Sequence, residues 1–193
     1  MRCLICEKLS ISHICKNCRI QYLSPNIFKR ELSSGLKVIS FYQYDEITDL
    51  IKTKNSYLGF YIFKILAESS IKLFLQELNL KTLTYLIPID DKVSKSGYSH
   101  TAILTNKSRV KKTVPLYRSL ISQSKVKYIG QSLNFRLENR RDFKIGKNIP
   151  KNSPLILIDD VITTGSTLNE ANEILQKYGV KDIFALTLAS TQK

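Results

Sequence analysis

Residues 154–168 form the segment that most constrains the fold of this 193-residue chain. Four consecutive apolar residues at 155–158 predict a strand buried on both faces, as in a parallel sheet. Two adjacent carboxylates, Asp159 and Asp160, follow this run and are expected at a solvent-facing strand end. After a short turn, apolar residues at helical spacing from Leu168 to Tyr178 predict a helix. This order favours an α/β fold, in which ligands bind beyond the carboxyl ends of parallel strands.

The turn between the carboxylates and the helix has the composition of an anion-binding loop. It contains Thr163, Thr164, Gly165, Ser166 and Thr167. Backbone N–H groups at a helix N-terminus attract a phosphate, and a glycine lets the backbone close around it. The two carboxylates can accept hydrogen bonds from ribose hydroxyls or hold Mg²⁺ through water. The segment therefore predicts a site for a ribose 5-phosphate moiety. The alternative is an ordinary strand–turn–helix in which Thr167 and Glu170 form a capping box.

The four cysteines of the chain stand in two C-x2-C pairs near the N-terminus, Cys3 with Cys6 and Cys15 with Cys18. Four thiolates in two such pairs predict a tetrahedral, structural zinc site. Two alternatives are open. Disulfides would need an oxidising compartment, and a redox Cys-x-x-Cys normally stands alone. His13 lies between the pairs and is expected on the surface.

Length and periodicity predict a small zinc-ribbon-like segment, residues 1–30, followed by one α/β domain at 31–193. The expected strands are 36–42, 83–89, 155–158 and 182–189. The expected helices are 46–53, 58–79 with a break near 69–70, and 98–112. A last helix is expected to follow the hydroxyl-rich turn and to end at 178, with Gly179 as its C-cap. Residues 19–35 read as a polar connection and 125–145 as a basic, flexible hairpin or loop. No apolar stretch is long enough to span a membrane, and no targeting signal is evident, so we expect a cytoplasmic protein.

Residues 155–168 resemble the 5-phosphoribosyl-1-pyrophosphate (PRPP) motif of type I phosphoribosyltransferases. With the cysteine pairs, an Ile-Pro-Ile strand end at 87–89 and the string at 97–100, nearly the whole chain resembles the ComF-type competence proteins. That family joins a zinc ribbon to a type I phosphoribosyltransferase-like domain and is associated with DNA uptake in natural transformation. The resemblance implies a parallel sheet flanked by helices, with PRPP and Mg²⁺ bound at 159–167. The family's usual arginine is absent before Gly97, so Lys95 or Lys92 is expected to supply the cation for the pyrophosphate.

Positive charge is concentrated in one part of the chain. The net charge is +14, and residues 105–147 hold twelve basic and two acidic residues, a local charge of +10. Aromatic residues are interleaved with these cations, a combination that suits single-stranded DNA, although a general lysine-rich surface is the alternative. The candidate DNA contacts are Lys111, Lys112, Lys125, Lys127, Tyr128, Phe135, Arg136, Arg140 and Arg141.

Two classes of function follow. The first is a binding protein that binds PRPP with Mg²⁺ and handles single-stranded DNA during uptake, with other competence or DNA-processing proteins as partners. The second is an active phosphoribosyltransferase that transfers phosphoribosyl from PRPP to a nitrogenous base or amine. In that enzyme, residues 125–145 would form a lid whose Arg136, Arg140 or Arg141 closes over the pyrophosphate. No acceptor pocket is recognisable in the sequence, because the residues that build one in this fold are variable, and turnover stays open. The predicted zinc ribbon occupies the N-terminal position of the hood that would cover the acceptor, which favours the first class. A third hypothesis is a sensor in which PRPP regulates DNA binding.

Overall fold

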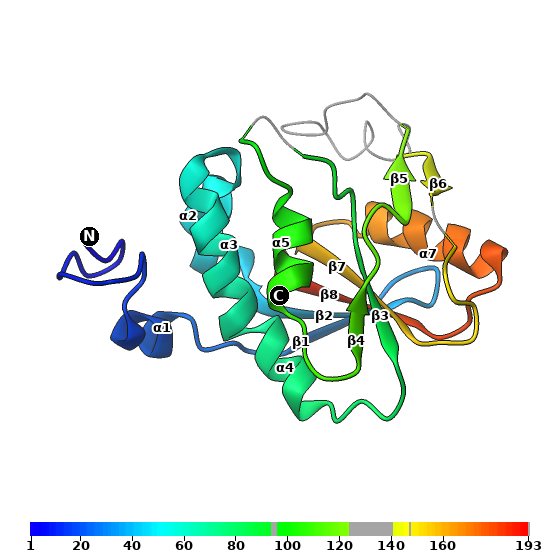
Figure 1. Cartoon of the computed structure of the whole chain (residues 1–193), viewed down its shortest axis with the longest axis horizontal. Coiled ribbons are helices and arrows are strands. Elements are labelled where there is room, and N and C mark those ends of the chain that lie inside the picture. The colour runs from blue at the N-terminus through cyan, green and yellow to red at the C-terminus, as the bar shows by residue number, and fades with distance from the viewer. Residues whose placement is uncertain (94–95, 124–140, 147, 193) are drawn as a thin grey trace.

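The computed structural model describes residues 1–93, 96–123, 141–146 and 148–192 (Figure 1). The strands of the main sheet are β1 (Phe28–Glu31), β2 (Lys37–Gln43), β3 (Thr84–Pro88), β4 (Thr113–Pro115), β7 (Leu155–Ile162) and β8 (Ile183–Ser190). The helices are α1 (Lys16–Tyr22), α2 (Tyr44–Lys52), α3 (Tyr57–Ser69), α4 (Ile71–Glu77), α5 (His100–Lys107) and α7 (Ser166–Tyr178), with a 3-10 turn, η1, at Thr53–Asn55. A second, two-stranded sheet pairs β5 (Leu120–Ser122) with β6 (Phe143–Ile145).

The main sheet has the strand order β1-β2-β8-β7-β3-β4. All neighbouring strands are parallel apart from β1 and β2, which are antiparallel. Strand β7 lies in the interior of the sheet, between β8 and β3. The predicted mixed α/β fold with a mostly parallel sheet is confirmed, and the strand that carries the two carboxylates is one of its central strands.

Two apolar cores cover the two faces of the sheet. Along β7, Ile156 and Ile158 pack into the core that α3, α4 and α5 share, whereas Leu155 and Leu157 pack into the core beneath α7. Figure 1 shows α3 and α5 on one side of the sheet and α7 on the other. All four of these β7 side chains are fully buried. The unbroken apolar run at 155–158 therefore reflects burial on both faces, as predicted.

The cysteine-containing segment rests on the helical side of the domain. Cys3, Ile14 and Cys18 belong to the same core as the α3 side chains. The His13 ring stacks on Tyr61 of α3 with ring centroids 4.4 Å apart. Figure 1 shows this segment on the outer side of α2 and α3. Burial of two cysteine side chains joins this part of the chain to the main core.

The connection at 19–35 is more ordered than predicted, because it contains the end of α1 and the edge strand β1. Strand β1 pairs with β2 through a tight turn in which Gly35 has a φ of 74°. The predicted helix at 98–112 is shorter and ends at Lys107. Beyond it, the N–H of Val110 donates to Oγ1 of Thr113, which closes a turn before β4. Strand β1 and the turn before β4 could not be predicted from periodicity, because both are polar and too short to repeat an apolar pattern.

Strand β7 also runs further than predicted. It pairs with β8 as far as Ile162 opposite Ser190, so the two carboxylates lie within the strand. Asp160 is only 7% exposed, and the expectation of a solvent-facing strand end was wrong for it. Within the described residues, no helix is long and apolar enough to cross a membrane. The loop expected at 125–145 falls mainly on 124–140, outside the described residues, and its end is β6.

Candidate functional site

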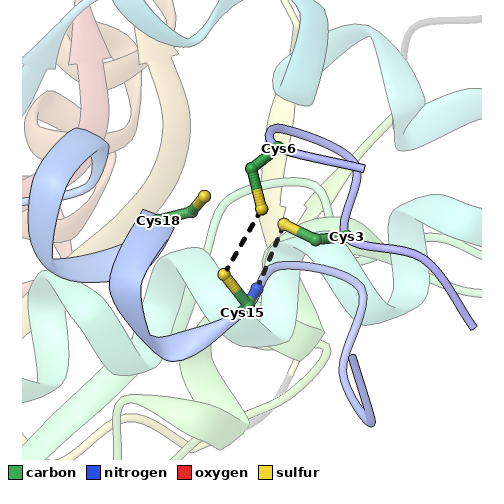
Figure 2. Close-up of side chains that lie close together, drawn as sticks. All are labelled: Cys3, Cys6, Cys15 and Cys18. Carbon is green, nitrogen blue, oxygen red and sulfur yellow. Dashed lines mark hydrogen bonds between the residues drawn. The ribbon is translucent and has the colours of Figure 1, made fainter. Parts of the chain in front are cut away.

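The four cysteine side chains lie close together and point toward a common centre (Figure 2). Their Sγ atoms all lie within 4.8 Å of one another, and those of Cys6 and Cys15 are 3.8 Å apart. Zn–S bonds of about 2.3 Å in a tetrahedron place the sulfurs roughly 3.8 Å apart, so the spacing suits zinc. None of the four cysteines is in a disulfide. The cluster could therefore hold a metal ion such as zinc, and His13 is not a member of it.

Local backbone structure brings the two cysteine pairs together. The first pair sits in a turn in which the N–H of Glu7 donates to the carbonyl of Cys3. In the second pair, Cys15 precedes α1 and Cys18 lies in its first turn. The N–H of Cys15 donates to Sγ of Cys3 at 3.3 Å. Burial disfavours a thiolate at Cys3, but this bond and others from backbone N–H groups outweigh it and lower its pKa to about 6. Thiolates are the form that binds a metal ion.

The acid pair on β7 has two chemically different members. Nζ of Lys54, in η1, lies 2.8 Å from Oδ2 of Asp160, and Nε2 of His100 lies 3.5 Å from the same oxygen. Burial opposes ionisation of Asp160, but the charges of His100 and Lys54 outweigh it and hold the pKa of Asp160 at about 2. Burial lowers the pKa of His100. Lys54 is therefore the permanent cation that balances the Asp160 carboxylate at neutral pH.

Asp159 forms no ion pair with any residue that the structure describes. Its Oδ1 accepts a hydrogen bond from the N–H of Asp160 at 2.8 Å. Burial, followed by the negative charge of Asp160, raises the pKa of Asp159 well above its usual value. The pair thus combines one ionised carboxylate with one that protonates readily. Such a pair can both accept and donate hydrogen bonds, as recognition of a diol requires.

The loop after β7 turns sharply into α7 at Gly165, which has a left-handed backbone conformation. Gly165 has a φ of 82° and stands immediately before α7, with no side-chain cap on the helix. A Cβ at this position would lie 2.7 Å from Cδ2 of Leu32, so any side chain there would be both strained and crowded. The Thr164 and Ser166 hydroxyls are 3.1 Å apart. The capping box of Thr167 and Glu170, which was the alternative interpretation of this segment, is not formed.

Edge strand β1 supports this loop from outside. The Arg30 guanidinium donates to the carbonyls of Thr163 at 2.7 Å and Thr164 at 3.1 Å. Both bonds hold carbonyl oxygens that would otherwise repel an anion bound in the loop. No sequence pattern identified Arg30 or Lys54, because Arg30 contacts the loop and Lys54 contacts β7 across more than a hundred residues of chain.

Arg141 lies near the end of β3 and close enough to the acid pair to affect the ionisation of Asp159. Its guanidinium forms an ion pair with Asp90, which follows β3. Its backbone N–H, and that of Phe143, donate to the two carboxylate oxygens of Glu170. The positive charge of Arg141 also counteracts the raised pKa of Asp159. Glu170 therefore fixes the start of β6 beside the site instead of capping α7.

The other candidate residues are distributed differently from the prediction. Lys111 and Lys112 lie in the turn before β4, at the amino ends of the parallel strands. Nζ of Lys92, one of the two cations expected at the pyrophosphate, donates to the carbonyl of Ser122. The remaining candidates lie outside the described residues: Lys95, Lys125, Lys127, Tyr128, Phe135, Arg136 and Arg140.

Comparison with known proteins assigns the class of the domain. A family model described as "Phosphoribosyl transferase domain" matches residues 100–193, which include β7, the loop and α7. Among solved structures, a hypoxanthine phosphoribosyltransferase from Staphylococcus aureus aligns with a TM-score of 0.43 and 17% identity, over 66% of this chain and 62% of that one. Orotate phosphoribosyltransferase from Aeropyrum pernix aligns with a TM-score of 0.41 and 16% identity, over 92% and 81%. The chain carries a type I phosphoribosyltransferase-like α/β domain.

Two competence proteins are similar to this chain in sequence. The chain is 31% identical over 100 residues to Competence protein F of Haemophilus influenzae, a match that covers 49% of this chain and 44% of that protein. It is 27% identical over 100 residues to Competence protein ComFC of Streptococcus pneumoniae, covering 52% and 38%. The match thus spans less than half the length of either relative. The chain is a relative of the ComF-type competence proteins, as the sequence motifs predicted.

Proposed function

We propose that this protein binds PRPP together with Mg²⁺ at residues 159–167. The order of groups along the chain carries this proposal: an acid pair on a central strand, then hydroxyl side chains, then a left-handed glycine at the start of α7. Backbone N–H groups and hydroxyls of the loop would receive the 5-phosphate. The acid pair would receive the two ribose hydroxyls. The match of residues 100–193 to the phosphoribosyl transferase domain supports this assignment.

The surrounding residues would have supporting roles in that complex. Lys54 fixes the orientation of the Asp160 carboxylate, and Arg30 keeps the loop carbonyls turned away from the phosphate. Arg141 supplies positive charge next to the acid pair, on the side where β3 ends. Mg²⁺ would be held by the acid pair through water and would neutralise part of the pyrophosphate charge.

We further propose that Cys3, Cys6, Cys15 and Cys18 hold a structural zinc ion. The donor set is four sulfurs, and their spacing matches that of a tetrahedral site. Closed four-thiolate sites leave no position for a substrate, which gives the zinc a structural role. Residues 1–30 would then be a zinc-ribbon-like segment attached to the phosphoribosyltransferase-like domain.

From the relatives we infer a role in competence, in which the protein handles single-stranded DNA during uptake. The names of the relatives support the process, and the net charge of +14 supports a polyanionic partner. Other competence or DNA-processing proteins are the expected protein partners.

One pair of measurements tests the proposed ligand and separates binding from turnover. Calorimetric titration with PRPP and Mg²⁺ should give saturable binding at one site per chain. Release of pyrophosphate should then be assayed with a panel of purine bases, pyrimidine bases and ammonia. Binding without release supports the binding role, and release with one acceptor favours the phosphoribosyltransferase alternative. Absence of binding would overturn the proposal.

A further inference from the structure

A basic groove lies on the domain, away from the acid pair. Its volume is about 390 Å³. The lining residues come from α4, from the connection after it and from the turn before β4: Lys72, Leu75, Gln76, Asn79, Leu80, Arg109, Val110, Lys111 and Lys112. Four of these nine residues are cationic and none is acidic. We call this surface the α4 groove.

The α4 groove lies at the opposite edge of the sheet from residues 159–167. Its walls precede strands β3 and β4, which begin at Thr84 and Thr113 and run parallel to each other and to β7. The Thr84 N–H donates to the carbonyl of Lys112, which joins the two walls at 2.9 Å. Figure 1 shows α4, its connection to β3 and the turn before β4 together at the lower edge of the view. The candidate PRPP loop follows the carboxyl end of β7, so the two sites face different directions.

The cations of the groove have different local roles. The Lys112 ammonium donates to the carbonyls of Leu80 at 2.9 Å and Lys81 at 3.0 Å, so it fixes the α4–β3 connection. Arg109 and Lys111 are exposed, and Lys72 is half-buried. Among the ion pairs of the described residues, none includes Lys72, Arg109 or Lys111. Three cations therefore face the groove without an acidic partner among the residues that the structure describes.

The rest of the lining fits a chain-like polyanion. The side-chain amides of Gln76 and Asn79 provide hydrogen-bond donors between the cations. Leu80 and Val110, both half-buried, add apolar surface to the lining. Several cations along one groove suit a chain of phosphates, whereas a free phosphate would use only one or two of them. The lining contains no aromatic ring on which a base could stack, so the groove would contact the backbone of the strand.

We propose that the α4 groove binds the phosphodiester backbone of single-stranded DNA. This inference rests on the proposed function and assigns its DNA-binding surface. Because the groove and residues 159–167 lie at opposite edges of the sheet, DNA and PRPP bind at the same time without competing. The sequence grouped Lys111, Lys112 and Arg141 into one basic region, whereas only the first two belong to this surface.

The test measures the fluorescence anisotropy of a labelled oligothymidylate across a series of salt concentrations. The groove variant is Arg109→Gln with Lys111→Gln, and Lys112 is kept because its ammonium holds backbone carbonyls. The matched control, Lys16→Gln with Lys29→Gln, removes the same charge from exposed positions near α1 and β1. The groove variant should lose about 10-fold or more in affinity at low salt and flatten the salt slope by roughly 1.4, as two lost phosphate contacts predict. The control should change affinity by less than about 2-fold.

If wild-type protein does not bind the oligonucleotide, the DNA-handling part of the proposed function fails and the groove assignment fails with it. If wild type binds and both double variants bind alike, the groove assignment is wrong while DNA handling stands. Thermal unfolding of both variants checks that they fold. A saturating amount of PRPP and Mg²⁺ should leave DNA affinity unchanged, and displacement of the oligonucleotide would contradict separate sites.

Discussion

At the residue scale, Asp159 and Asp160 differ although they are adjacent in sequence and on the same strand. Asp160 is stabilised as a carboxylate by Lys54, whereas burial next to Asp160 disfavours the charge of Asp159. An ordinary folded domain gains nothing from two carboxylates in a central strand, because desolvation of the second one costs free energy. The pair is therefore a cost to stability that a ligand can offset, as functional sites commonly are.

This difference predicts opposite effects of pH on stability. The pKa of Asp160 is about 2 in the folded protein against an ordinary 3.8, so its contribution is present above pH 4 and is lost as the pH falls toward 2. The pKa of Asp159 is raised, so its ionisation lowers stability as the pH rises above 4. Asp160→Asn should lower the free energy of unfolding at pH 7 by about 2 kcal/mol, whereas Asp159→Asn should raise it or leave it unchanged. Urea unfolding without Mg²⁺ from pH 3 to 8 measures both, and equal losses for the two variants would contradict this assignment.

Gly165 gives a second prediction at this scale, with an internal control. Gly35→Ala meets no neighbouring atom but takes a φ of 74°, so it should cost about 1 kcal/mol of stability. Gly165→Ala has a similar φ and in addition crowds Leu32, so it should cost roughly 1 kcal/mol more. It should also weaken PRPP binding, which Gly35→Ala should not. Chemical denaturation and calorimetry check both effects, and a PRPP affinity that is equally reduced by the two variants would remove the special role of the loop.

At the scale of elements, the sequence predicted those strands and helices whose apolar pattern is long enough to repeat. The run at 155–158 identified β7, and Gly179 marked the end of α7, where its φ is 105°. Strand β1 could not be predicted, because four residues with alternate half-exposed side chains carry no clear pattern. Glu170 shows a second limit. Its spacing from Thr167 fits a capping box, but its carboxylate binds the backbone of 141–143, a contact that depends on tertiary structure.

The support that β1 gives to the loop can be tested through Arg30. Arg30→Gln removes two charge-assisted bonds to the Thr163 and Thr164 carbonyls, each worth roughly 1.5–3 kcal/mol at most, and leaves those oxygens near the bound phosphate. PRPP affinity should fall by about 10-fold or more. Lys29→Gln, on the exposed side of the same strand, should have no such effect. Calorimetry measures the PRPP affinity of both variants, and equal PRPP affinities of the two would mean that β1 does not position the loop.

For the N-terminal segment, one zinc ion per chain should co-purify with protein kept reduced. Cys18→Ser should lose it and destabilise residues 1–30, because folding of such segments is coupled to metal binding. His13→Ala is the matched control, since His13 stacks on Tyr61 and lies outside the sulfur cluster. Elemental analysis measures the metal content. Retention of zinc by Cys18→Ser, or its loss from His13→Ala, would show that the ligand set is different.

At the scale of the whole molecule, the parallel sheet determines which residues meet. Lys54 and His100 reach Asp160, and Arg141 reaches Asp90, because the segments that follow parallel strands converge at one edge. No local pattern contains this information. The same geometry separates Lys111 from Arg141, which a count of charges along the sequence had placed together. Motifs thus identified the acid pair, the loop and the cysteines, whereas their partners became visible only from the topology.

The central claim is that the loop at 163–167 binds the 5-phosphate of a phosphoribosyl ligand. Its most direct test is an NMR titration of ¹⁵N-labelled protein with ribose 5-phosphate, following each assigned backbone amide. The amides of Gly165, Ser166 and Thr167 should shift and reach saturation together, since their N–H groups would contact the phosphate. Shifts confined to Lys72, Asn79 and other residues of the α4 groove, or no saturable shift in the loop, would contradict the claim.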